Sequence, residues 1–64
     1  MDKELLRKVN LVRIIDDKNM DFEKFSYSDY AYDLTSEDID EIWDLYCEMR
    51  NVGYVEFNEK YKND

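Results

Sequence analysis

Apolar residues recur every three or four positions in the middle of the chain, between about residues 36 and 51. The residues at this spacing are Ile39, Ile42, Trp43, Tyr46 and Met49. On an α-helix they would form one continuous apolar stripe, which predicts a helix with one buried side. The positions between them are mostly acidic. The pattern therefore predicts a central amphipathic, acidic helix over residues 36–51, the clearest element of the chain.

Local signals mark both ends of this helix. Thr35 can cap its start with Asp38 three residues later, an aspartate version of the capping box, and Leu34 can pack on Ile39 across the cap. Gly53 is the only glycine in the chain and follows the last apolar position. A residue that leaves a helix with a positive φ is most often glycine, so we expect the helix to end there.

The remaining elements are less sharply defined. Leu5, Leu6, Val9 and Val12 suit a helix over residues 3–15, in which a β-branched run spreads apolar side chains nearly all round. Such a helix needs burial from more than one side, either in this core or against a second copy of the chain. The polar residues 16–19 would end it.

Residues 21–33 carry mixed signals. Asp21 can cap a short helix, whereas Tyr30, Tyr32 and Leu34 alternate as in a strand, and helix or irregular coil is favoured. Tyr54, Phe57 and Tyr61 predict a short last helix that folds back after the glycine. We therefore expect an all-α fold of three to four short helices in a single small domain, residues 1–64. Phe22 and Phe25 should lie inside, with some tyrosines at the rim.

Composition limits the supports available to this fold. The chain has 64 residues, one cysteine and no histidine, so neither an internal disulfide nor a Cys/His zinc site can stabilise it. The lone cysteine and the lack of a leader predict a cytoplasmic protein, and no apolar run is long enough to span a membrane. Residues 1–15 carry a charge of +2, whereas residues 16–64 carry −10. This excess disfavours direct binding to nucleic acid or membrane and points to a basic protein as partner.

The acidic residues concentrate in one stretch. Between Phe25 and Met49 there are eight carboxylates and no lysine or arginine, so we expect a surface without counter-charge of its own. Five acids of the central helix share its spacing and span about 16 Å at the helical rise. This places about one negative charge every 4 Å along the helix, close to the roughly 3.4 Å between phosphates of one DNA strand. Two interpretations stay open: an ordinary solvated helix face, or a mimic of nucleic acid.

The candidate partner-binding residues follow from this stretch. They are Asp29, Asp33, Glu37, Asp40, Glu41, Asp44 and Glu48, with Tyr30, Tyr32 and Trp43 as aromatic anchors. No catalytic residue, metal ligand or cofactor site is predicted. An EF-hand counted from Asp29 would place Leu34 where the turn glycine belongs, and Cys47 lies beside two acids that oppose thiolate formation.

Three functions are compatible with these features. The first is a non-enzymatic inhibitor that occupies the basic groove of a nucleic-acid-binding enzyme or regulator. The small size, the acidity and the lack of catalytic groups resemble the general type of phage or mobile-element protein that disables such an enzyme, a resemblance of composition without a shared motif. The second is a homodimeric structural or regulatory adaptor assembled through residues 3–15. The third is an antitoxin-like neutraliser of a basic partner.

Overall fold

Four α-helices and one 3-10 turn make up the computed structural model, which describes residues 2–62. In chain order they are α1 (Lys3–Lys18), α2 (Phe22–Ser26), η1 (Asp29–Ala31), α3 (Ser36–Val52) and α4 (Tyr54–Lys60). No strand occurs in this range, so the predicted all-α fold is confirmed. The alternating segment Tyr30 to Leu34 forms η1 and the coil after it.

Helix α1 runs three residues further than predicted. The Asp2 carboxylate caps its start by accepting a hydrogen bond from the Glu4 amide (3.3 Å). At its end Asn19 adopts a left-handed conformation (φ 53°), and the Met20 amide donates to the Ile15 carbonyl (3.0 Å). This is a Schellman motif, and asparagine is one of the few residues other than glycine that enter it at low cost. The helix therefore ends at Asn19 and not at the first polar residue after Ile15.

Helix α3 is the predicted central helix, and the signals predicted for both of its ends are confirmed. The Asp38 amide donates to Thr35 Oγ1 (3.1 Å) and the Thr35 amide donates to Asp38 Oδ2 (3.2 Å), which completes the predicted capping box. Gly53 has φ 97° and ψ 152°, a combination essentially restricted to glycine. Its amide donates to the Met49 carbonyl (2.8 Å), and its carbonyl accepts from the Phe57 amide (3.0 Å). One glycine thus ends α3 and starts α4.

Helix α2 begins at Asp21, whose carboxylate accepts a hydrogen bond from the Lys24 amide (2.7 Å). Phe25 is fully buried, as expected. Phe22 is 51% exposed, so the expectation that it lies inside is wrong. Phe22 is the first residue of α2, and its ring packs at the edge of the core against Trp43 (centroids 5.6 Å apart).

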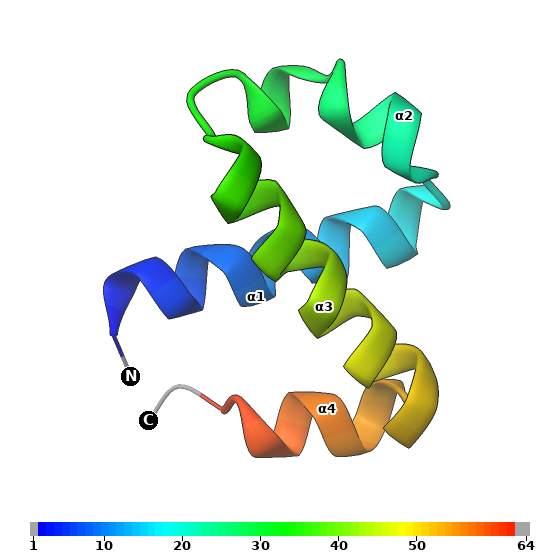
Figure 1. The fold of residues 1–64 in the computed structure, drawn as a ribbon. Coiled ribbons are helices and arrows are strands. Elements are labelled where there is room, and N and C mark those ends of the chain that lie inside the picture. Colours follow the sequence, from blue (N-terminus) through cyan, green and yellow to red (C-terminus); the bar gives the residue numbers. More distant parts are fainter. Residues whose placement is uncertain (1, 63–64) are drawn as a thin grey trace.

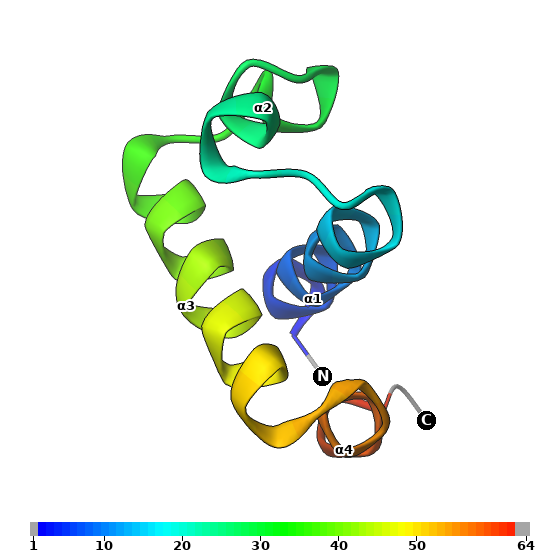
Figure 2. The same cartoon turned by 90° about the vertical axis from the view of Figure 1, so that its right-hand side faces the viewer.

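The helices enclose one apolar core. In Figure 1 α3 crosses α1, and α4 returns beside α1 in the opposite direction; Figure 2 shows α1 and α4 end-on with α3 across them. Every element contributes to the buried set, which is Val9, Leu11, Val12, Ile15, Phe25, Ala31, Ile42, Met49 and Phe57. Arg13 Nε also donates to Asn58 Oδ1 (2.7 Å), which links α1 to α4. The apolar side of α1 is thus buried within its own chain.

Candidate functional site

The predicted acids of the central helix lie together on the outer side of α3. They are Glu37, Asp40, Glu41, Asp44 and Glu48, and we call this set the acidic face. Four of them are exposed and Glu48 is half-buried, whereas Ile42 and Met49 on the other side of the helix are buried. Since side chains three and four residues apart are neighbours on a helix, these carboxylates adjoin one another along α3.

Two bases of α1 pair with acids at the start of α3 and just before it. Arg7 Nη2 lies 2.5 Å from Asp33 Oδ1. Lys8 Nζ contacts the Glu41 carboxylate and lies 3.5 Å from Asp38 Oδ1. The Lys8 side chain is only 14% exposed, so its ammonium group is held against α3.

A base of α4 pairs with the far end of the acidic face. Lys60 Nζ lies 2.9 Å from Glu48 Oε2, and the Tyr61 hydroxyl donates to Glu48 Oε1 (3.2 Å). Half of the eight carboxylates in residues 25–49 therefore have a partner in this chain: Asp33, Asp38, Glu41 and Glu48. The expectation that this stretch has no counter-charge of its own is wrong for these four, because α1 and α4 fold against α3 and bring their bases to it.

These ion pairs favour the charged forms of their members. The hydrogen bond from Arg7 lowers the pKa of Asp33 and raises that of Arg7. The hydrogen bond to Glu41 raises the pKa of Lys8, against a partial desolvation that lowers it. Hydrogen bonds and nearby opposite charge are the ordinary causes of such shifts. Arg7, Lys8 and Asp33 thus remain ionised over a wider range of pH than the same side chains free in water.

The other half of the acids point to solvent without a counter-charge. Asp29, Glu37, Asp40 and Asp44 form no ion pair within residues 2–62. Glu37, Asp40 and Asp44 are all exposed and follow one another on α3 at spacings of three and four, and we call them the unpaired strip. The seven steps between the first and the last correspond to about 10 Å of helix. The strip is the part of the acidic face that a cationic partner would meet first.

The predicted aromatic anchors lie in two environments. Tyr32 is 90% exposed and Tyr30 is 36% exposed. Trp43 instead packs between α2 and α3, with ring centroids 5.6 Å from Phe22 and 4.8 Å from Tyr46. Its indole Nε1 is buried and has no hydrogen-bond partner among the described residues. Trp43 therefore helps to hold α2 on α3, whereas Tyr32 and, to a smaller extent, Tyr30 are accessible to solvent.

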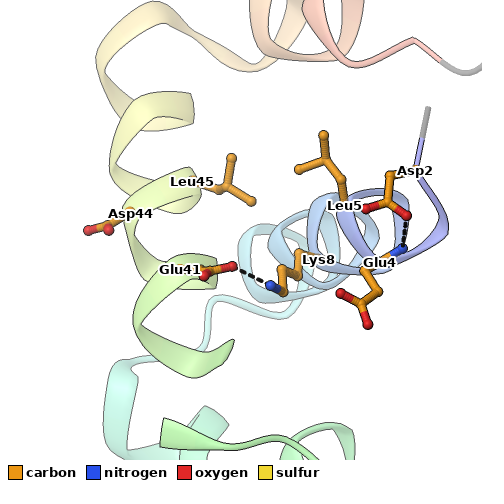
Figure 3. Close-up of a pocket in the computed structure, with 7 residues that line it drawn as sticks. All are labelled: Asp2, Glu4, Leu5, Lys8, Glu41, Asp44 and Leu45. Carbon is orange, nitrogen blue, oxygen red and sulfur yellow. Dashed lines mark hydrogen bonds and ion pairs between the residues drawn. The ribbon is translucent and has the colours of Figure 1, made fainter. Parts of the chain in front are cut away.

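Sequence reasoning missed a groove between the first half of α1 and the middle of α3 (Figure 3). It encloses about 470 Å³ and is lined by Asp2, Glu4, Leu5, Lys8, Glu41, Asp44 and Leu45. In Figure 3 Leu5 and Leu45 approach each other from the two helices, and Lys8 reaches toward Glu41. No periodicity within one helix predicts this groove, because it depends on how the two helices cross. The one available signal was the basic excess of residues 1–15, which an acidic helix would attract.

Other chemistry finds little support in this surface. Among residues 2–62 no three His, Cys, Asp or Glu side chains converge as ligands for a metal ion. Over the same range, none of the helices has the length and apolar character needed to cross a membrane. Comparisons with models of known protein families, with curated proteins and with solved structures found no significant match. The acidic face, its unpaired strip and the groove are therefore the features from which a function can be inferred.

Proposed function

We propose that this chain is a non-enzymatic, cytoplasmic binding protein that occupies a basic groove of a nucleic-acid-handling protein and excludes nucleic acid from it. The observation that carries the proposal is the unpaired strip on α3. Its three carboxylates stay exposed and without counter-charge among residues 2–62, although three bases of the chain pair with acids beside it. A cationic groove is the complementary surface for such a strip.

The repulsion between Asp40 and Asp44 within the strip disfavours folding of the isolated chain. Asp40 and Asp44 are one helical turn apart, and like charges at this spacing cost about 0.2–0.5 kcal/mol, whereas an opposite pair would stabilise the helix by a similar amount. A chain of 64 residues has an unfolding free energy of only about 3–10 kcal/mol. A small loss of folding stability with no compensating gain is expected at surfaces whose residues are selected for binding a partner.

Rigidity adds to the proposed mechanism. The strip lies on a helix of 17 residues whose start is closed by a capping box and whose end is fixed by Gly53. Its charges are therefore in place before a partner arrives, and binding orders fewer groups than a flexible acidic tail would. Asp29 and the exposed Tyr32 would extend the contact beyond the start of α3, and the overall charge of −8 would speed the encounter with a basic protein.

The structure favours this proposal over an adaptor that dimerises through residues 3–15. Val9, Leu11, Val12 and Ile15, which such a dimer would bury between two copies, are buried in the core of their own chain. Pairing through them would require that this core be opened. An antitoxin-like neutraliser would use the same acidic surface, and the identity of the partner distinguishes it from an inhibitor of a nucleic-acid enzyme.

Affinity capture from a lysate at low and at high salt, followed by a nucleic-acid competition assay on the captured protein, tests the proposal. The informative variant is Glu37→Gln with Asp40→Lys, which changes the strip without touching a residue of any ion pair. Glu56→Gln with Glu59→Lys is a matched control, because it makes the same charge change on exposed residues of α4, one of them likewise in a first turn.

We expect the captured protein to be a nucleic-acid-binding protein that releases its nucleic acid when the parent chain is added. The strip variant should compete at least about ten-fold less well, and the control should stay within about three-fold of the parent. A strip variant that competes as well as the parent would contradict the proposal.

A further inference from the structure

The groove between α1 and α3 combines an apolar floor with an acidic rim, whereas the unpaired strip is acidic only. Its floor is apolar, since Leu5 and Leu45 approach each other there from the two helices (Figure 3). Its rim is acidic, formed by Asp2, Glu4, Glu41 and Asp44. Lys8 is the one base among the described lining residues and already pairs with Glu41, whereas the carboxylate of Asp44 points away from α1 (Figure 3). The lining residues together carry a side-chain charge of −3.

We propose that this groove receives one long cationic side chain, a lysine or arginine, from the basic partner. The methylene stem would lie on Leu5 and Leu45, and the charged end would reach the carboxylates of Asp2 and Glu4 on α1 (Figure 3). The inference rests on the proposed function, because it assigns to the same basic partner a second, more specific contact beside the strip.

The chemistry of the occupant follows from the lining. Lysine and arginine carry a charged end on an apolar stem, and they bind best where both parts find a complementary surface. A purely acidic surface would attract the charge and leave the stem in water. The groove has a volume of about 470 Å³ and is open to solvent, so a side chain of a partner can enter it. The amino end of α1 contributes roughly half a positive charge, which leaves the groove clearly negative.

The chain itself already holds one cation at this place. Lys8 reaches across from α1, with its side chain 14% exposed and its ammonium group against Glu41 and 3.5 Å from Asp38. Carboxylates of α3 thus accept an ammonium group brought to them along the surface of α1. Neither Asp2 nor Glu4 forms an ion pair within residues 2–62, so both carboxylates remain available to a second cation, although Asp2 also caps α1 by accepting from the Glu4 amide.

NMR of the complete, isotope-labelled chain with two synthetic peptides tests the groove. Both peptides have equal length and charge; one carries arginines separated by glycines, and the other carries 2-amino-3-guanidinopropionic acid in their place, which has the same guanidinium group on a stem of one methylene. We expect contacts between arginine methylenes and the methyl groups of Leu5 and Leu45. The arginine peptide should bind tighter by roughly four-fold for each methylene that the floor buries.

A paired substitution separates the groove from the strip. Asp2→Asn with Glu4→Gln removes two rim charges, and asparagine retains the ability to cap α1. It should weaken the arginine peptide about ten-fold, whereas Asp17→Asn with Glu23→Gln, the same charge change on exposed residues outside the groove lining, should weaken it less than about three-fold.

Two results would overturn the groove as a site. One is equal affinity for both peptides, with spectral changes confined to Glu37, Asp40 and their neighbours and no contacts at Leu5 or Leu45. The other is no binding of either peptide. Neither result decides the proposed function, which is judged by nucleic-acid competition with variants at residues 37 and 40, outside the groove lining.

Discussion

Substitution of Asp44 by lysine should stabilise the isolated protein. Three acids of the same face lie three or four residues from it: Asp40, Glu41 and Glu48. Glu41 and Glu48 already pair with Lys8 and Lys60, so the repulsion that remains uncompensated is the one with Asp40. Asp44 is exposed, and its side chain can be replaced without disturbing the core.

The size of the effect follows from these neighbours. Asp44→Lys removes one like-charge pair and creates an attractive pair with Asp40, each worth about 0.2–0.5 kcal/mol, with the acid on the favourable amino-terminal side of the lysine. Lysine is also the better helix former by a few tenths of a kcal/mol. The free energy of unfolding should therefore rise by about 1 kcal/mol. For a domain of this size that corresponds to about 4–8 °C in Tm.

Thermal unfolding followed by far-ultraviolet circular dichroism at low and at high salt measures this change. Asp44→Asn is the control, because it removes the repulsion without creating an attraction or changing helix propensity much, and it should give about a third of the gain. Near 1 M salt the screening length falls to about 3 Å, so only the part due to helix propensity should persist. An unchanged or lower Tm for Asp44→Lys at low salt, or a gain that salt does not reduce, would refute the claim that the acidic face disfavours folding.

Three further predictions concern the fold and its ion pairs. Gly53→Ala should lower the free energy of unfolding by about 1–3 kcal/mol, because alanine is strained at this φ and ψ. Backbone strain is the whole cause, since no atom lies within 4 Å of the added Cβ and a steric clash is thus excluded. Gly53→Asn should lower the free energy of unfolding as much as Gly53→Ala, since ψ 152° lies outside the left-handed helical region that asparagine tolerates. If urea unfolding showed Gly53→Asn to be as stable as the parent, the assigned conformation of Gly53 would be contradicted. Ile42 is fully buried in α3, so Ile42→Val should cost about 0.5–1.5 kcal/mol and Ile42→Ala about 2–5 kcal/mol, and equal stabilities of the two variants in urea would argue against its place in the core. Because Arg7 lowers the pKa of Asp33 below its usual 3.8, the pair stabilises the fold above that pH and its contribution is lost as the pH falls through the lowered pKa. The difference in Tm between the parent and Asp33→Asn should therefore be present at neutral pH and vanish in acid, and a difference independent of pH would exclude the ion pair as its cause.

The helices could be predicted because their signals are local. The capping box needs only Thr35 and Asp38, and the end of α3 needs only a glycine that can adopt a positive φ. The polar residues after Ile15 predict an end of α1 that is too early, because polar residues do not by themselves break a helix. The helix continues to Lys18 and ends in a Schellman motif at Asn19. Whether this motif forms depends on the backbone conformation of Asn19, which the sequence pattern does not specify.

The candidate site could be predicted only in part. The outward placement of the acids follows from the same periodicity that buries Ile42 and Met49. The ion pairs do not follow from any local pattern, since Arg7 and Asp33 are 26 residues apart and Lys8 and Glu41 are 33 apart. These contacts and the groove depend on the crossing of α1 and α3, which a pattern within one helix cannot specify.

The positions of the chain's own bases decide how the acidic face can be used. Lys8 approaches α3 along the side that packs on α1, and Lys60 approaches it from α4, so both meet acids at the margins of the face. Neither base pairs with Asp40 or Asp44, which are both exposed. Pairing at the margins fixes Glu41 and Glu48 and lowers the mutual repulsion of the face, so that α3 can fold with its centre still negatively charged. A partner with a basic groove would then meet a narrow line of charge on a stable helix, bordered on the α1 side by a groove of suitable size and chemistry for one of its own lysines or arginines.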